Sequence, residues 1–430
     1  MREMKDSSVA WIGEMPANWS LHTIGSLFRV RNEKVSDKDY EPLSVSRGGV
    51  VPQMENVAKT DANDNRKLVL KDDFAINSRS DRKQSCGVSP LDGSVSLINT
   101  VLYLAPTAPM NVAYPNLLMK NYGFAEEFYR WGHGIVADLW TTRWQEMKSI
   151  LLPVPSVDEQ QRIFDRVISE TQKVAELIAN QEAQIEKLKA YKQSLITEVV
   201  TKGLDPTVPM KDSGVDWIGE IPDGWSVLPL KSICEFGKGL PITKADLTPE
   251  GIQVVSYGQI HSKQNSGTHL NQSLVRYVSE KYLSSNDTSL GRQGDIFFAD
   301  TSEDYDGIGN AVLIDTSTET FAGYHTIIAR PSTPQNSKFL AYLFLTDMWR
   351  SQLRCLASGI KVFSVTQSML KRVSVIMPEE GAQKLIVEYL DEKCSHIDRL
   401  IAIKQSKIEK LNDYKKSLIY EYVTGKKEAI

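Results

Sequence analysis

The sequence has 430 residues, of which 41% are hydrophobic and 24% are charged, and its formal net charge is −4. This composition is typical of a folded protein with two or three domains, and it excludes an overall basic field that would attract nucleic acid or membranes. The four cysteines are far apart, so neither a disulfide framework nor a zinc site is indicated. No apolar run approaches the roughly 18 residues that cross a bilayer, and no signal peptide is recognisable. We therefore expect a cytoplasmic protein that makes no membrane contact.

An N-terminal segment, residues 1–16, precedes a first globular domain predicted over 17–155. Short β-type runs such as DDFAINS, VSLINTVLYLAP and SILLPVP lie between turn signals, and short helices are expected near the end of the domain. Basic and hydroxyl side chains in the polar loops suit phosphate oxygens and guanine edges, although charge runs in loops are more often simply solvated. The candidate DNA contacts of this domain are Ser46, Arg47, Arg79, Arg82, Lys83 and Arg143.

A long helix is predicted over residues 156–203, because 158–201 contains neither Gly nor Pro and its apolar side chains follow a heptad. A linker at 204–223 leads to a second globular domain at 224–378, with strand-like runs IQVVSYG, GDIFFAD, NAVLIDT and TIIARP. An aromatic side chain combined with amide, hydroxyl and basic groups is a plausible mixture for reading bases. The candidate DNA contacts here are Tyr257, Gln259, His261, Lys263, Thr301 and Lys361.

A second long helix is predicted over residues 379–425, followed by a tail at 426–430. The chain is a tandem duplication: Trp19 returns as Trp225, a shift of 206, and Tyr191 returns as Tyr414, a shift of 223. The ends of the two halves match well, whereas the interiors differ. This pattern indicates two related modules with different targets, although ordinary drift after duplication would also produce it.

Each long helix of about 44 residues would extend ~65 Å, and nothing in its own half could cover such an apolar stripe. We therefore expect the two helices to pack on each other as a coiled coil, and the duplication favours an antiparallel pair. The predicted fold class is α+β, with two mixed α/β globular domains related by pseudo-twofold symmetry and joined by this coiled coil. The candidate coiled-coil and partner-binding residues are Gln160, Ile178, Gln181, Ile185, Leu188, Tyr191, Gln383, Ile401, Lys404, Ile408, Leu411 and Tyr414.

The sequence resembles the specificity (S) subunit of type I restriction-modification systems. The resemblance is carried by WIGEMPANW and WIGEIPDGW, by DLWTTRWQEMKSILLPVPSVDEQQRI before the first helix, and by the helix ends YKQSLITEVVTKG and YKKSLIYEYVTGK. One departure is EEGAQKLI, which stands at the second helix entry where DEQQRI is more typical, although Gln383 keeps the place of Gln160. The resemblance covers nearly the whole chain.

The resemblance implies two target recognition domains that read the halves of a split DNA site, with the helices fixing their spacing. It also implies docking of two modification subunits, which bind S-adenosylmethionine and methylate adenine, and of restriction subunits that use ATP and magnesium. This chain would bind no cofactor or metal and would not be catalytic. Two alternatives stay open: a stand-alone coiled-coil adaptor that presents two protein-binding modules, and a fused DNA-modifying enzyme, against which the absence of a phosphate loop and of methyltransferase and nuclease motifs argues.

Overall fold

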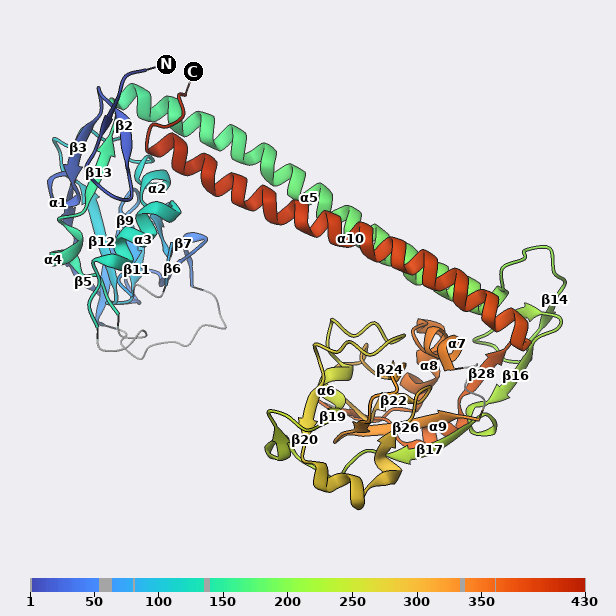
Figure 1. Cartoon of the computed structure of the whole chain (residues 1–430). Helices are drawn as coiled ribbons and strands as arrows, with labels where there is room; N and C mark the ends of the chain where they lie inside the picture. Colours follow the sequence, from blue (N-terminus) through green and yellow to red (C-terminus); the bar gives the residue numbers. More distant parts are fainter. Residues whose placement is uncertain are drawn as a thin grey trace. The chain divides into compact units, whose positions relative to one another are not determined.

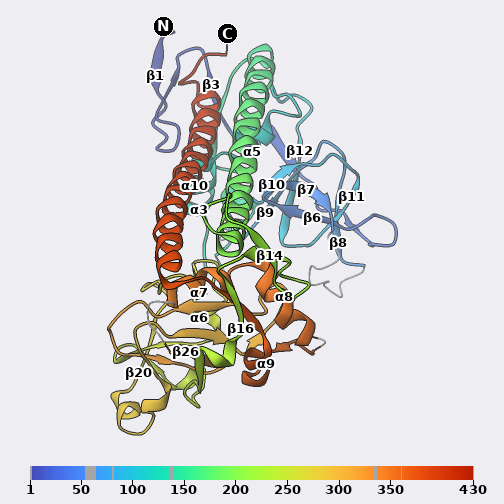
Figure 2. The ribbon, with the colours of Figure 1, turned by 90° about the vertical axis from the view of Figure 1, so that its right-hand side faces the viewer.

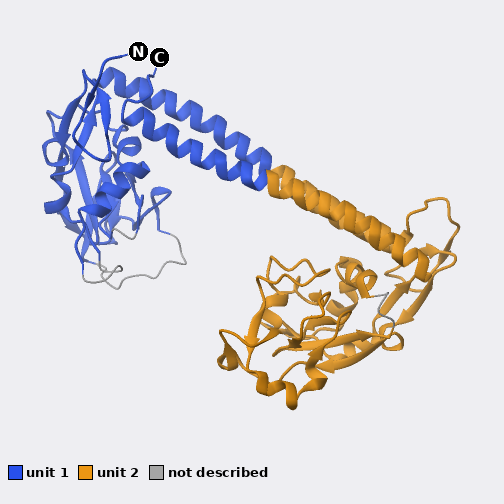
Figure 3. Ribbon diagram, viewed as in Figure 1, with its two compact units in different colours: residues 1–182, 404–430 blue, residues 183–403 orange. Residues whose placement is uncertain are grey.

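The computed structural model describes residues 2–53, 64–79, 82–134, 140–332, 337–359 and 361–429 (Figure 1). The chain divides into two compact units, of which unit 1 comprises residues 1–182 and 404–430 and unit 2 comprises residues 183–403 (Figure 3). Two long helices, α5 (Val157–Lys202) and α10 (Glu380–Val423), each contribute one part to each unit. The predicted α+β class with two long paired helices is therefore confirmed.

Unit 1 is built around an antiparallel four-stranded sheet in the order β10-β9-β12-β4, beside a three-stranded sheet β11-β8-β5. Its main core gathers apolar side chains from the sheet, from α2 and α3, and from the parts of α5 and α10 that belong to this unit. The strands of unit 1 are β1 (Met4–Asp6), β2 (Glu14–Pro16), β3 (Ser20–Thr23), β4 (Phe28–Val30), β5 (Lys34–Val35), β6 (Leu43–Ser46), β7 (Gly49–Pro52), β8 (Arg66–Val69), β9 (Phe74–Asn77), β10 (Cys86–Val88), β11 (Gly93–Val95), β12 (Asn99–Leu104) and β13 (Leu151–Val154). Its short helices are α1 (Ile24–Leu27), α2 (Pro115–Leu118), α3 (Tyr122–Arg130) and α4 (Trp144–Met147).

Unit 2 contains a four-stranded sheet in the order β17-β26-β22-β24 and a five-stranded sheet in the order β18-β20-β19-β25-β21. Its strands are β14 (Met210–Asp212), β15 (Glu220–Pro222), β16 (Ser226–Pro229), β17 (Cys234–Lys238), β18 (Leu247–Thr248), β19 (Ile252–Val255), β20 (Arg276–Val278), β21 (Leu290–Gly291), β22 (Ile296–Ala299), β23 (Thr301–Ser302), β24 (Ala311–Leu313), β25 (Thr320–Ala322), β26 (Thr326–Pro331), β27 (Phe363–Ser364) and β28 (Ser374–Met377). Its α-helices are α6 (Tyr257–Ile260), α7 (Ser337–Phe344), α8 (Asp347–Leu356) and α9 (Gln367–Arg372), and its 3₁₀ helices are η2 (Leu230–Ser232), η3 (Lys244–Asp246), η4 (Glu280–Ser284) and η5 (Asp287–Ser289).

The two four-stranded sheets have the same topology, although their sequences do not match. Strands β4, β12, β9 and β10 of unit 1 correspond in order to β17, β26, β22 and β24 of unit 2. The first strands begin at Phe28 and Cys234, which are 206 positions apart, and helices α4 and α9 begin at Trp144 and Gln367, which are 223 apart. The duplication therefore extends through the interiors as a fold. The halves differ in their side chains and in the second sheet, which has three strands in unit 1 and five in unit 2.

The long helices pair in an antiparallel arrangement within each unit, and both Figure 1 and Figure 2 show them side by side. In unit 1, Arg166 near the start of α5 donates to the Tyr422 hydroxyl near the end of α10 (3.4 Å). In unit 2, Lys192 near the end of α5 bonds Asp398 near the start of α10 (2.7 Å). The apolar heptad explains this pairing, because the side chains on that face of each helix are buried or half-buried.

The matching ends of the two halves pack against the helix of the other half. The Tyr420 hydroxyl of α10 donates to the Trp11 carbonyl in the first repeat (2.8 Å). In unit 2, Gly203 at the end of α5 lies against the Trp225 ring of the second repeat. Each unit also contains the same antiparallel strand pair. Ser20 lies opposite Val154 in unit 1, and the equivalent residues Ser226 and Met377 lie opposite each other in unit 2. Because both units make these contacts, the sequences at the ends of the two repeats are constrained in the same way, which accounts for their similarity.

A membrane-spanning helix, which would have to be long and apolar, is not found in the part of the chain that the structure describes.

Candidate nucleic-acid interface

The loop after the central strand β9 forms one edge of the candidate interface in unit 1. Arg79 lies two residues beyond β9 and forms an isolated antiparallel bridge with Thr141. Next to this bridge, the Thr142 amide donates to the Ser78 carbonyl (2.8 Å). Two segments that lie about 60 residues apart in the sequence are thereby joined, so the backbone positions of Arg79 and Arg143 are fixed close to one another.

Unit 2 repeats this backbone arrangement with different side chains. Thr301 lies two residues beyond β22 and pairs with Ser364 in the short ladder of β23 and β27. The Val365 amide donates to the Asp300 carbonyl (2.7 Å), as Thr142 does to Ser78 in unit 1. Arg79 and Thr301, both predicted from the sequence as DNA contacts, therefore occupy equivalent positions.

The predicted basic residues of unit 1 gather around this edge. Ser46 and Arg47 lie at the turn between β6 and β7, and the Arg47 Nε donates to the Lys83 carbonyl (3.4 Å). The Arg82 amide donates to the Arg79 carbonyl (3.1 Å). The side chains of Arg47, Arg79 and Arg82 are exposed, and the two loops that carry them are joined by the bond from Arg47 to Lys83. Exposed basic side chains attract phosphate without requiring a basic net charge of the whole chain.

Lys83 has partners within unit 1 that would compete with DNA for its charge. Its Nζ bonds both carboxylate oxygens of Glu126 (2.8 Å) and lies 4.6 Å from the centre of the Tyr129 ring. The side chain of Glu126 is 62% exposed, so this ion pair is weak and can be exchanged for a phosphate.

Arg143 borders a hollow of 440 Å³ in unit 1. The hollow is lined by Lys67 and Arg143 and by the exposed apolar side chains of Leu97 and Ile98, among others. Burial lowers the pKa of Lys67, and its Nζ donates to the Asn99 carbonyl (2.7 Å). The hollow therefore offers both positive charge and an apolar wall to whatever enters it.

The predicted residues of unit 2 gather on the surface around α6 and the loop after β22. Tyr257 and Gln259 lie in α6, and the Tyr257 ring contacts the ring of His261 edge-on at 6.2 Å between centroids. His261 bonds the Thr301 carbonyl (2.8 Å), which joins α6 to the interface edge. Lys263 lies exposed after α6, and Lys361 lies exposed two residues before β27.

His261 has both ring nitrogens engaged within the protein. Arg350 Nη1 donates to Asn310 Oδ1 (2.7 Å), so the Asn310 amide nitrogen must donate to His261 Nδ1 (3.0 Å). The ring proton is therefore on Nε2, which donates to the Thr301 carbonyl. This geometry indicates that His261 positions the loop after β22, while its role as a base contact stays a prediction.

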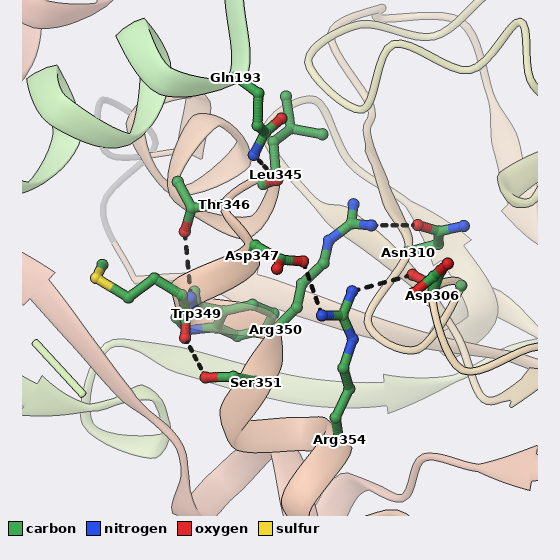
Figure 4. A network of polar contacts seen from close by, with 12 residues as sticks. Gln193, Asp306, Asn310, Leu345, Thr346, Asp347, Trp349, Arg350, Ser351 and Arg354 are labelled. Atoms are coloured by element: carbon green, nitrogen blue, oxygen red, sulfur yellow. Dashed lines mark hydrogen bonds and ion pairs between the residues drawn. The ribbon is translucent and has the colours of Figure 1, made fainter. Parts of the chain in front are cut away.

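Arg350 anchors this chain of hydrogen bonds through Asn310, and Figure 4 shows the contact between these two residues. The Arg350 Nε donates to the Phe344 carbonyl at the end of α7 (2.8 Å), and burial lowers the pKa of Arg350 to about 10. One turn later, Arg354 bonds Asp347 (2.7 Å). The loop between β22 and β24 is thus held by helix α8.

Sequence reasoning missed three residues at the interface: Ile98 in unit 1, and Asp300 and His325 in unit 2. His325 Nδ1 lies 3.1 Å from Asp300 Oδ1, and the side chain of His325 is 56% exposed. The signal in the sequence was a Gly-Tyr-His turn directly before the run TIIARP. The pattern could not show that this turn lies beside Thr301, because the strand order sets that contact.

Ten of the candidate partner-binding residues fall into two groups on the paired helices. Buried or half-buried side chains form the contact between the helices, and two tyrosines lie on its outside. Tyr191 is 58% exposed in unit 2 and Tyr414 is 50% exposed in unit 1. The first group comprises Ile178, Gln181, Ile185, Leu188, Ile401, Lys404, Ile408 and Leu411.

Gln160 and Gln383 lie at the start of the two long helices and are buried. The side-chain amide of Gln160 accepts from the Asn111 amide (2.8 Å) and donates to the carbonyls of Pro109 (2.8 Å) and Pro155 (2.9 Å). Gln383 makes the equivalent bond to Pro378 (2.7 Å). Each glutamine therefore holds, from a buried position, the backbone segment that leads into its long helix.

Glu170 of α5 carries the electrostatic contact between the helices in unit 1. Its carboxylate bonds Arg166 (2.7 Å), Lys427 (3.5 Å) and the Tyr422 hydroxyl (3.2 Å). Burial raises the pKa of Glu170, but the positive charges of Lys427 and Arg166 outweigh this effect, so the pKa lies below its ordinary value.

Within the described residues, no group of three or more His, Cys, Asp or Glu side chains is placed to hold a metal ion. Two units whose four-stranded sheets share one topology, each with an exposed polar edge of its own composition, define a duplicated two-domain protein. Residues 222–413 match the family model described as "Type I restriction modification DNA specificity domain". The resemblance of this chain to type I specificity subunits is therefore confirmed, and residues 222–413 form a domain of that family.

Similar proteins agree with this family. The chain is 25% identical over 287 residues to the type I restriction enzyme MjaVIII specificity subunit of Methanocaldococcus jannaschii, and 24% identical over 289 residues to the putative MjaX specificity subunit of that organism. Each match covers 65% of this chain, which spans about three fifths of these relatives (62% and 60%).

Solved structures share the fold. The first belongs to a study of "complex assembly and conformational transition of the type I R-M system", with a TM-score of 0.68, 14% identity, and coverage of 95% of this chain and 98% of the other. The second is the HsdS subunit from Thermoanaerobacter tengcongensis, with a TM-score of 0.51, 16% identity, and coverage of 96% and 98%.

Proposed function

We propose that this chain is the sequence-specific DNA-binding subunit of a type I restriction-modification complex, and that each unit reads one half of a split site. The observation that carries the proposal is the backbone arrangement after β9 in unit 1, which is repeated after β22 in unit 2. Equivalent backbone positions carry Arg79 in unit 1 and Thr301 in unit 2, so one frame presents different side chains to DNA. Specificity of this kind needs only a few base-edge contacts in each unit, each worth roughly 1–3 kcal/mol.

The chain would not be catalytic and would act by directing its partners. Two modification subunits would methylate adenine with S-adenosylmethionine, and restriction subunits would cut DNA with ATP and magnesium. Tyr191 and Tyr414 support the docking of two like partners, because they are equivalent, exposed and placed one in each unit. The net charge of −4 favours a division of labour in which the modification subunits supply much of the phosphate binding.

The proposal is tested by mapping modified adenines in cells that contain the modification subunits with or without this chain. We expect a split motif that appears only when the chain is present. Purified chain alone is expected to bind DNA weakly in a gel shift, and the complex tightly. Methylation that is independent of the chain, or tight site-specific binding by the chain alone, would contradict the proposal.

A further inference from the structure

His325 stands at the candidate interface of unit 2 in a backbone conformation that costs energy. Its φ is 55°, in the left-handed region that residues with a Cβ seldom adopt. The residue before the strand β26 could adopt this conformation more easily as glycine. A histidine kept in this conformation and 56% exposed indicates a use for the side chain at the surface.

The surroundings of His325 fix its ring in one direction. Nδ1 bonds the Asp300 carboxylate (3.1 Å), which also accepts from the Thr301 hydroxyl (2.7 Å). The rings of Tyr257 and Tyr324 lie edge-on at 5.4 Å and 6.1 Å between centroids. Since Nδ1 donates to the carboxylate, Nε2 is the nitrogen left to meet a ligand.

This cluster does not have the geometry of a catalytic relay. The Thr301 hydroxyl lies 3.3 Å from Nδ1 and bonds the same oxygen of Asp300 as the ring does. In a nucleophilic triad the hydroxyl and the carboxylate face opposite nitrogens of the imidazole. The arrangement therefore orients the ring for binding.

Unit 1 carries an exposed apolar residue at the equivalent place. The Asp300 amide donates to the His325 carbonyl (3.1 Å), and the Ser78 amide donates in the same way to the Ile98 carbonyl (3.2 Å). Ile98 is 37% exposed and lines the hollow beside Arg143. A solvent-facing isoleucine at this place suits the methyl group of thymine, whereas an imidazole suits a polar base edge.

We infer that residues 98 and 325 are equivalent base-reading positions, at which Ile98 contacts a thymine methyl group and His325 Nε2 hydrogen-bonds a polar base edge in the major groove of double-stranded DNA. The inference rests on the proposed function and names the residues that distinguish the two half-sites. It also gives a role to the strained conformation of His325 beside the Asp300 carboxylate.

The test uses the complex with its modification subunits and a library of duplexes randomised in both half-sites. His325→Gly removes the imidazole and relieves the backbone strain, so its unfolding midpoint should be equal or higher. We expect discrimination at one base pair of one half-site to fall about 10- to 100-fold. Ile98→Ala should relax one base pair of the other half-site. The matched control is His269→Gly, at an exposed histidine elsewhere in unit 2, which should leave the base preferences unchanged.

An unchanged base profile in His325→Gly, with the wild-type profile intact, would overturn the inference and leave the proposed function standing. A uniform loss of affinity for all sequences would also overturn it, because that result is typical of a phosphate contact. A wild-type complex without any base preference would overturn the proposed function, and this inference with it.

Discussion

Replacing Arg350 by methionine tests whether helix α8 holds the loop between β22 and β24. The substitution keeps the apolar stem but removes the donors to Phe344 and Asn310. A buried polar group left without a partner costs roughly 1–3 kcal/mol, so two such groups cost about 2–6 kcal/mol. The desolvation of the guanidinium, which lowers the pKa of Arg350, is relieved at the same time and offsets part of this loss. We therefore expect a net loss of about 2–4 kcal/mol.

The measurement is hydrogen exchange of the amides of β24, read by mass spectrometry on the intact chain. A loss of about 2–4 kcal/mol corresponds to exchange that is roughly 30- to 1,000-fold faster. Lys211→Met, at an exposed ion pair with Asp223 elsewhere in unit 2, is the control, because such a pair contributes only ~0–1 kcal/mol. Equal protection of β24 in the two variants would refute the reasoning.

Three further predictions concern the long helices. Gln160→Leu should lower the unfolding free energy by about 2–4 kcal/mol, because it leaves three backbone groups without a partner. Gln383→Leu leaves only one such group, so it should lower the unfolding free energy by about 1–2 kcal/mol. Equal losses for the two variants in urea unfolding would contradict this prediction. Glu170 has a lowered pKa, so its stabilisation is present above about pH 5 and is lost as the pH falls through that pKa; the stability gap between wild type and Glu170→Gln should shrink from pH 7 to pH 3, and a constant gap would count against the ion pairs. Tyr191→Ala and Tyr414→Ala should each leave the unfolding free energy within about 0.5 kcal/mol of wild type. Each variant should nevertheless bind one modification subunit fewer, as measured by sedimentation with the purified partner. Retention of both subunits would show that these tyrosines are not part of the proposed docking surface.

The long helices could be predicted closely, because a heptad repeats over many turns and Gly and Pro mark its ends. The predicted ranges 156–203 and 379–425 compare with Val157–Lys202 and Glu380–Val423 in the structure. The duplication predicted two related domains, but the strand order of their sheets could not be predicted, since short strands are specified by their neighbours and the interiors have diverged. Periodicity reports a local pattern, whereas strand order depends on contacts between distant segments.

At the candidate interface, too, the sequence indicated suitable residue types but not where the residues lie in space. Arg79 and Thr301 were chosen for their residue types, and the strand pairing then placed them at equivalent positions. Ile98 and His325 were missed, because nothing in their sequence neighbourhoods reveals that each lies beside that edge. For His261 the residue type indicated a base contact, but its hydrogen bonds to Asn310 and Thr301 indicate a positioning role that only coordinates can show.

The central claim is that each unit reads its own half of a split DNA site. The most direct measurement is to exchange residues 17–155 for those of a similar protein with a different target and to map modified adenines in cells that contain the partner subunits. The account predicts a new sequence in one half of the motif, with the other half and the spacing unchanged. A change in both halves, or no change in either, would contradict it.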